Sequence, residues 1–280
     1  MAITAVEQRR ASDPTGGDHP AVVFEHVSLA FDEVVVLKDV SFTLERGHTK
    51  IILGASGSGK STILKLIVGL LRPDAGEVWV NGERINELSE TALMHVRQDL
   101  GMVFQEGALF DSLSVAENVG YKLLEEGMAA DEVWQRVEEV LGFVGLAEHM
   151  DKSPSELSGG QRRRVAIARA MAFKPRILLY DEATTGLDPI TAISVDQEIV
   201  KLRDIEKVSS IVVTHQLRDA FYVATHEAYA EGREIRTRPA GEQKADEAEF
   251  IMLKEGVVAF EGNAKELRAS RDDYIRSFLS

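Results

Sequence analysis

The chain has 280 residues, of which 44% are hydrophobic and 28% charged, as in an ordinary globular protein with a sizeable core. Its formal net charge of -14 disfavours nucleic acid and anionic lipid surfaces as partners. The sequence contains no cysteine, which excludes disulfide frameworks and thiolate metal sites. No apolar run approaches the ~20 residues of a membrane span, so a cytoplasmic protein is expected.

The first third of the chain is predicted to be a tail followed by strands and one helix. Residues 1–20 are rich in Pro, Gly and charge, which predicts a mobile tail. Short β-branched runs over 21–53 predict strands, and the apolar period of 61–71 predicts a helix. A further strand over 77–80 runs into an Asn-Gly pair, which is typical of a hairpin turn.

The middle of the chain alternates between helical and strand patterns. Residues from about 90 to 171 are predicted to be largely helical, and those from about 106 onward to form a helical subdomain. The fully apolar runs 177–180 and 211–213 are typical of parallel strands that are buried on both faces. This order favours an α/β core that carries a helical insertion.

The last part of the chain contains an irregular stretch and a terminal helix. Residues 226–248 combine charge, Pro and Gly without an apolar period, which predicts a solvated insertion loop or a loose hairpin. Strands are expected over 250–253 and 257–260. Residues 266–280 are predicted to end in a short helix that docks on the core through its apolar face.

A glycine-rich stretch that follows a predicted strand and precedes a predicted helix has the P-loop pattern. Its backbone N–H groups and the helix dipole favour phosphate, Lys60 reaches the β and γ phosphates, and Ser61 offers its hydroxyl to Mg²⁺. The predicted ATP-binding residues here are Gly54, Ala55, Ser56, Gly57, Ser58, Gly59, Lys60, Ser61 and Thr62.

Two acidic residues end the apolar strand over 177–180. Asp181 is predicted to hold Mg²⁺ through its water shell, and Glu182 to polarise the attacking water. Open α/β sheets bind their ligands at the carboxyl ends of such strands, so both acids are expected beside the P-loop.

A second anion-binding helix end is predicted from the motif Leu157-Ser158-Gly159-Gly160-Gln161 and the basic, apolar-periodic helix after it. One chain thus carries two ends that recognise phosphate. A single ATP held between two copies accounts for both, with the P-loop of one copy facing Ser158, Gly159, Gly160 and Gln161 of the other.

With these motifs, residues 21 to about 265 resemble the ATPase subunits of ABC transporters. The resemblance implies an adenine-stacking ring at Phe31, where tyrosine is more usual, and a Mg²⁺ and water contact at Gln105. It also implies a loop at Asp188 that contacts the opposing subunit and a switch histidine at His215 beside the γ-phosphate. Ala183 departs from the proline that many relatives carry after the glutamate.

The resemblance implies an α/β fold with a P-loop NTPase (RecA-like) core, an antiparallel β subdomain and an inserted helical subdomain. It implies ATP and Mg²⁺ as cofactors, and Lys60, Gln105, Glu182 and His215 as catalytic residues. The expected partners are a second copy, arranged head to tail, and an integral membrane permease. The chain is accordingly expected on the cytoplasmic side of the inner membrane, attached through that permease.

Competing functions remain open at this point. Soluble ABC ATPases of translation normally hold two cassettes, those of DNA repair are split by long coiled coils, and a plain P-loop kinase or GTPase has no use for residues 157–161. For the cargo, the segments 105–119 and 188–191 resemble the ATPase of mammalian-cell-entry and lipid-asymmetry transporters. This predicts a lipid cargo, with a substrate-binding lipid-type partner. An importer of amino acids or osmolytes is the alternative.

Overall fold

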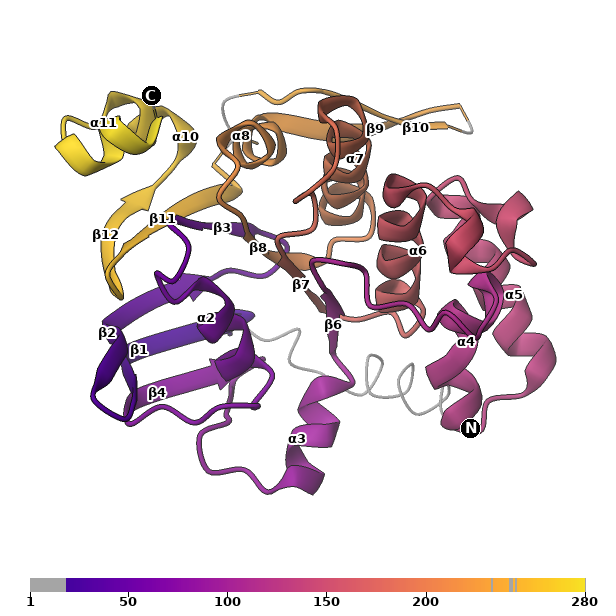
Figure 1. Cartoon of the computed structure of the whole chain (residues 1–280), viewed down its shortest axis with the longest axis horizontal. Helices are drawn as coiled ribbons and strands as arrows, with labels where there is room; N and C mark the ends of the chain where they lie inside the picture. The colour runs from indigo at the N-terminus through magenta and orange to yellow at the C-terminus, as the bar shows by residue number, and fades with distance from the viewer. Residues whose placement is uncertain (1–18, 233, 242–243, 245, 280) are drawn as a thin grey trace.

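The structure is a computed structural model that describes residues 19–232, 234–241, 244 and 246–279. Residues 1–18 of the predicted tail lie outside the described residues. Within them, a central sheet lies between an antiparallel sheet and a group of helices (Figure 1). This arrangement confirms the predicted α/β fold with an antiparallel β part and a helical part.

The central sheet has the strand order β12-β11-β3-β8-β7-β6, and all its pairs are parallel except β11 with β12. Its strands are β3 (Thr49–Gly54), β6 (Leu100–Val103), β7 (Ile177–Asp181), β8 (Ser209–Val213), β11 (Ala248–Lys254) and β12 (Val257–Gly262). The antiparallel sheet has the order β2-β1-β4-β5 and consists of β1 (Val22–Phe31), β2 (Val34–Leu44), β4 (Ala75–Val80) and β5 (Glu83–Arg84).

The helices lie on both sides of the central sheet. They are α2 (Lys60–Ile67), α3 (Glu90–Arg97), α4 (Val115–Glu125), α5 (Ala130–Phe143), α6 (Gly159–Met171), α7 (Pro189–Ile205), α8 (Leu217–Thr225), α10 (Ala264–Ala269) and α11 (Asp273–Leu279). In Figure 1, α4, α5 and α6 gather at the opposite end of the molecule from the antiparallel sheet. In the described part of the chain, none of these helices has the length and apolar character needed to cross a bilayer.

Alternate side chains of the central strands point to opposite faces of the sheet and pack into two separate hydrophobic cores. On β3, Ile51 packs with the helices α4 to α8, whereas Ile52 packs with α2 and the antiparallel sheet. Leu178 and Leu179 divide in the same way on β7. Burial on both faces explains why these strands are continuous apolar runs, and it holds their carboxyl ends at one edge of the sheet.

The predicted helical stretch over 90–171 is wrong in one part, because β6 lies within it. Gly101 lets β6 come close to its neighbours, since a Cβ there would lie 2.6 Å from Leu178 Cδ2 and 2.7 Å from the carbonyl oxygen of Ala170. The strand is short and is not a β-branched run, so the sequence carried no clear strand signal. Helices α4, α5 and α6 do occupy the range predicted for the helical subdomain.

The predicted insertion loop contains a paired hairpin, β9 (His226–Glu231) and β10 (Glu234–Pro239). Its base is fixed to the end of α7, where buried Arg203 donates to the His226 carbonyl and Asp204 accepts from the Ala228 N–H. Cross-strand ion pairs such as Arg238 with Glu227 replace the apolar alternation that the sequence lacked.

The end of the chain forms two helices, α10 and α11, where the sequence predicted one over 266–280. Ile275 is buried, and Tyr274, Phe278 and Leu279 pack partly against the core. This confirms the expected apolar face of the last helix. Ser280 lies outside the described residues.

Candidate active site

The loop between β3 and α2 is tightly folded, and one of its buried hydroxyl groups is available to bind a ligand. Gly59 has φ +101, and a Cβ there would lie 2.6 Å from Leu37 Cδ2, so glycine alone fits the position before α2. The hydroxyl of Ser58 is buried and has no hydrogen-bond partner among the described residues. A tight glycine loop at a helix N-terminus with a free hydroxyl fits a phosphate chain.

Lys60 points back into this loop. Its Nζ donates to the carbonyl oxygens of Gly54 at 2.8 Å and Ala55 at 3.0 Å, and it lies 3.8 Å from Glu182 Oε1. Burial lowers the pKa of Lys60, and the nearby Glu182 and Asp181 carboxylates oppose this shift. The ammonium group is therefore a buried cation whose direct protein ligands are mainly neutral carbonyls, which suits an anionic ligand.

Asp181 and Ser61 lie side by side, although they are 120 positions apart in the chain. Asp181 ends β7, Ser61 lies in the first turn of α2, and the Ser61 hydroxyl donates to Asp181 Oδ1 at 2.9 Å. Burial raises the pKa of Asp181, while the bond from Ser61 lowers it. One carboxylate and one hydroxyl beside a phosphate loop fit the donor set of Mg²⁺, which takes its remaining ligands from water and phosphate.

Glu182 is held in place from several sides. Its backbone has φ +52, a left-handed conformation that is strained for a non-glycine residue and that recurs at functional sites. Its Oε2 accepts from His215 Nδ1 at 2.7 Å and from the Thr185 hydroxyl at 2.8 Å. The sequence did not point to Thr185, whose one available signal is a hydroxyl three residues after an acid in a turn.

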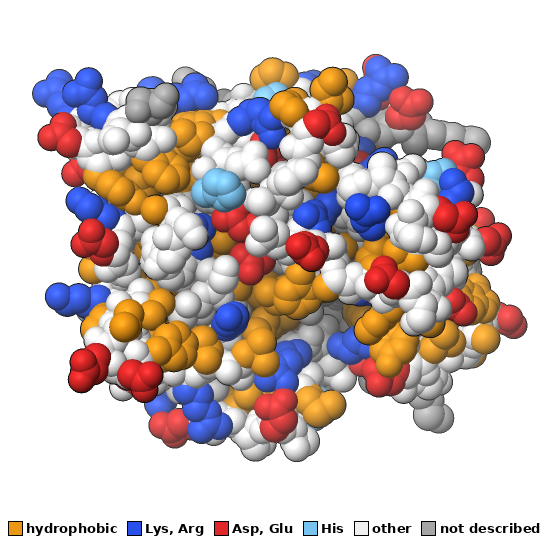
Figure 2. Space-filling view, viewed as in Figure 1, with side chains coloured by type: hydrophobic (Ala, Val, Ile, Leu, Met, Phe, Trp, Pro, Cys, Tyr) orange, Lys and Arg blue, Asp and Glu red, His pale blue; other side chains and the backbone are white. Residues whose placement is uncertain are grey.

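Lys60, Ser61, Glu182 and His215 meet in one cavity of about 640 Å³, whereas the predicted Gly54, Ser58 and Asp181 do not line it. The predicted residues that line it are Phe31, Ala55, Ser56, Gly57, Gly59, Lys60, Ser61, Thr62, Gln105, Glu182 and His215. Two lining residues, Val36 and Phe278, were not predicted. On the face shown in Figure 2, a histidine and acidic side chains lie at the centre, between apolar groups.

The second predicted phosphate-binding end is not part of this cavity. Ser158 caps α6 and forms a capping box with Gln161, in which each side chain accepts from the other residue's backbone N–H. Gln161 Nε2 also lies 2.9 Å from His149 Nε2. The cavity of the same chain is lined neither by residues 158–161 nor by Asp188.

Helix α7 packs tightly against the start of α6. A Cβ on Gly160 would lie only 2.2 Å from Thr191 Cγ2, so glycine is required there by close approach. Asp188 caps α7 and accepts from the N–H groups of Ile190 and Thr191. Hydrogen bonds from Thr191 lower the pKa of Asp188, which stays charged on the surface.

The other end of α6 holds the segment after Gln105. Arg169 donates from Nη1 to the Ala108 carbonyl at 2.7 Å and from Nη2 to the Gly107 carbonyl at 2.8 Å. Ala108 has a left-handed backbone with φ +48. Bonds from a guanidinium are among the stronger hydrogen bonds in proteins, so this segment and α6 are firmly joined.

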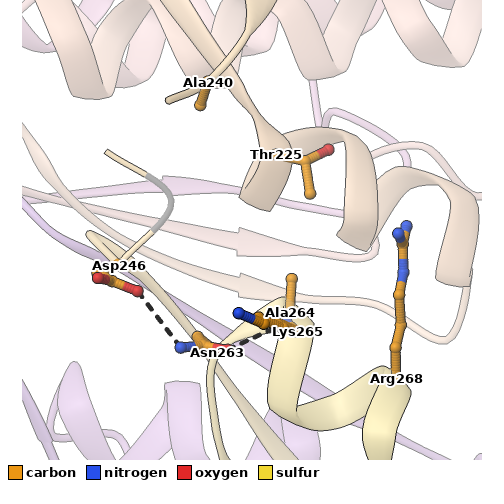
Figure 3. A pocket seen from close by; sticks show the side chains of 7 residues that line it. All are labelled: Thr225, Ala240, Asp246, Asn263, Ala264, Lys265 and Arg268. Carbon is orange, nitrogen blue, oxygen red and sulfur yellow. Dashed lines mark hydrogen bonds between the residues drawn. The ribbon is translucent and has the colours of Figure 1, made fainter. Parts of the chain in front are cut away.

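A second cavity, of about 540 Å³ (Figure 3), has none of the predicted site residues in its lining. It is lined by Thr225, Ala240, Asp246, Asn263, Ala264, Lys265 and Arg268. Its polar groups already serve the fold, since Asn263 caps α10 and lies 3.3 Å from Asp246. We assign no ligand to it.

Residues 37–185 match the family model described as "ABC transporter". The chain belongs to the ABC transporter family. The matched range includes the P-loop, the residues 157–161 and the acids at the end of β7. The family resemblance, and the ATPase class that it implied, are therefore supported.

Curated relatives carry the name of an amino-acid importer. The chain is 43% identical over 205 residues to "Methionine import ATP-binding protein MetN" of Bifidobacterium longum, covering 71% of this chain and 51% of that protein. It is 46% identical to the protein of the same name from Symbiobacterium thermophilum, covering 66% and 56%. The chain thus spans about half the length of these relatives. Their names favour the amino-acid alternative over the predicted lipid cargo.

A solved structure supports the fold and shows a pair. Its title is "Dimeric structure of a post-hydrolysis state of the ATP-binding cassette MJ0796 bound to ADP and Pi". The two chains superpose with a TM-score of 0.70 at 33% identity, over 86% of this chain and 98% of the other. This similarity confirms the predicted P-loop NTPase core.

Proposed function

We propose that the chain binds Mg-ATP in the 640 Å³ cavity and hydrolyses it. The observation that carries this proposal is the Glu182 carboxylate, which lies between Lys60 Nζ at 3.8 Å and His215 Nδ1 at 2.7 Å beside the P-loop. Phosphoryl transfer depends mainly on positioning and on charge stabilisation, and this cavity supplies a fixed acceptor oxygen next to a buried cation.

The γ-phosphoryl group of ATP would pass to water, which gives ADP and inorganic phosphate, and Mg²⁺ when bound would neutralise charge on the transferred group. Lys60 would turn from its loop carbonyls to phosphate oxygens, while Ser61, Asp181 and Gln105 would hold Mg²⁺. Glu182 accepts a hydrogen bond from the attacking water, and Thr185 and His215 hold its carboxylate in position. Phe31 offers its ring face to the adenine.

The functional form is proposed to be a head-to-tail pair of chains. In one chain the residues 158–161 lie outside the cavity that contains Lys60, so a second copy has to bring its own α6 N-terminus to the phosphates. The dimeric title of the MJ0796 structure supports such a pair. ATP binding would then close the two copies, and hydrolysis would let them open.

The pair is proposed to drive a membrane permease from the cytoplasmic face of the membrane. Phe104 and Phe110 flank the segment after Gln105 and are 43% and 47% exposed, and Phe110 packs against the exposed Tyr121 of α4. Exposed aromatic groups beside the catalytic Gln105 suit a partner helix that responds to nucleotide. The chain itself would be peripheral, attached through that permease.

For the cargo, the names of the relatives favour an amino acid or a similar small solute, taken up by import. A lipid cargo is the second candidate. One local observation favours it: residues 105–119, around the exposed Phe110, resemble the ATPases of lipid systems. The segment that would touch the permease is where partner identity is most directly encoded.

Co-expression with candidate permeases tests the transport function and the cargo together. The chain is expressed with an amino-acid permease or with a lipid-type permease and its substrate-binding partner, and stable complexes are isolated and assayed for stimulated ATPase activity. Assembly with the amino-acid permease alone supports the first cargo, and assembly with the lipid permease alone supports the second. A chain that hydrolyses ATP but joins neither type of permease would contradict the transport function.

A further inference from the structure

The last helix contributes a wall to the nucleotide cavity. Phe278 of α11 lines the same cavity as Lys60, Glu182 and His215, although it lies 63 positions beyond His215 in the sequence. Its side chain is half-buried and packs partly against the core. In Figure 2, apolar side chains extend from the region of α11 toward the histidine and acidic groups at the centre of the face. No motif identified in the sequence includes this residue.

The placement of α11 is fixed by contacts to the start of the P-loop. The Tyr274 hydroxyl donates to the carbonyl oxygen of Leu253 at 3.1 Å, and Leu253 is the direct strand partner of Gly54. Ile275 is buried, and Asp272 accepts from the first N–H groups of the helix. Phe278 is therefore carried by a helix that is anchored beside the first residue of the loop.

Phe278 and Phe31 reach the same cavity from different elements, α11 and the end of β1. Val36, which follows Phe31 in the chain, lies beside the last glycine of the loop, because a Cβ on Gly59 would lie 3.0 Å from the Val36 carbonyl oxygen. Leu279 of α11 shares a groove with Leu217 and Phe221 of α8, the helix that starts two residues after His215. The end of α11 thus lies beside α8, the helix that follows His215 in the chain.

We propose that Phe278 is a positioning residue that covers the γ-phosphate end of the cavity and favours ATP over ADP. The inference rests on the proposed ATPase function and deepens it. An apolar ring in the wall of the cavity that contains Glu182 and His215 would keep bulk water from the reacting phosphate, which would strengthen the polar contacts made to it. Because ADP has no γ-phosphate, the ring contributes little to its binding. Helix α11 thereby responds to the hydrolytic state of the nucleotide.

Nucleotide affinities of matched variants test this assignment. In Phe278→Ala, the affinity for the ATP analogue AMP-PNP should fall about fivefold, while ADP binding stays within about twofold. Leu279→Ala, in the neighbouring residue outside the cavity, should change neither affinity. Phe31→Ala should weaken both nucleotides to the same extent, because its ring faces the adenine. Phe278→Leu, which keeps an apolar side chain, should restore most of the preference.

A tryptophan reporter gives an independent measurement. Fluorescence of Phe278→Trp should change on adding AMP-PNP and not on adding ADP, whereas Leu279→Trp should respond to neither. Wild-type protein that binds AMP-PNP, combined with an unaltered AMP-PNP to ADP ratio in Phe278→Ala, would overturn the inference alone. Wild-type protein that binds neither nucleotide would overturn the proposed function as well.

Discussion

Two glycine-rich helix ends look alike in the sequence and use their glycines differently in the structure. At the start of α2, Gly57 has φ +80 and a Cβ there would meet nothing within 4 Å, so this glycine serves the backbone conformation of the loop. At the start of α6, Gly159 and Gly160 lie inside the helix, and Gly160 serves the distance to Thr191 of α7. The first end therefore depends on its own dihedral angles, and the second depends on a neighbouring helix.

The largest expected effect comes from replacing Glu182, the acid that lies beside the P-loop. Glu182→Gln should reduce ATP turnover by about 10²- to 10⁴-fold, because the amide keeps the shape but accepts protons poorly. ATP binding should persist and trap a closed pair, visible by size-exclusion chromatography with ATP. Turnover is measured by phosphate release. Glu125→Gln, at the exposed end of α4, is the matched control and should keep the wild-type rate. Turnover at the wild-type rate would remove Glu182 from its proposed role.

The next comparison separates binding by one copy from pairing of two. Lys60→Ala should weaken ATP binding about 10- to 100-fold, because it deletes a charged hydrogen-bond donor to the phosphates. Ser158→Ala should leave the affinity of a single copy within about twofold and lower turnover instead. Fluorescent-nucleotide titration at low protein concentration measures the first quantity. Ser114→Ala, which removes the equivalent cap of α4, controls for loss of helix capping.

A third pair of variants tests the two uses of glycine directly. Gly160→Ala should destabilise the fold by about 1–3 kcal/mol, because its Cβ would overlap Thr191 Cγ2. Adding Thr191→Ser removes that methyl group and should recover most of the loss. Gly57→Ala has no neighbour to clash with, so its cost of about 1 kcal/mol should resist rescue by any neighbour. Denaturant unfolding of wild type, these three variants and the Thr191→Ser single variant measures these differences, and additive losses in the Gly160–Thr191 pair would contradict the packing explanation.

The smallest effect concerns α7, the helix that packs against the start of α6. Burial, and then the nearby Asp219, raise the pKa of Asp196 on α7 to about 8. The folded state therefore holds a proton that the unfolded state releases near its ordinary pKa, and stability falls as pH rises toward 8. Asp196→Asn should remove up to about 1.4 kcal/mol of this loss per pH unit.

Urea unfolding at pH 6, 7 and 8 measures this dependence. The exposed Asp111→Asn serves as the control and should keep the wild-type slope. An Asp196→Asn variant with the same slope as wild type would show that Asp196 does not carry the proton.

Local chemistry determined which parts of the molecule the sequence could predict. The loop before α2 and the acids after β7 were predictable, because phosphate binding demands those residue types at fixed spacing beside apolar strands. Thr185 and Phe278 were not, since their roles come from a turn and from a distant helix. The sequence left residues 226–248 open between a solvated loop and a loose hairpin, because Arg203 and Asp204, which fix the base of β9–β10, lie in another element.

The bonds from Arg169 to the carbonyls of Gly107 and Ala108 join one end of α6 to the segment after Gln105, so a tilt of the helix at this point would displace its other end. Ser158 lies at its opposite end, about 16.5 Å from Arg169 at about 1.5 Å of helix rise per residue. A tilt of about 4° around the arginine would move Ser158 by about 1 Å, a shift comparable to the tolerance of a phosphate contact. A small displacement where the chain would meet a permease thus becomes a change in reach at the nucleotide of the other copy.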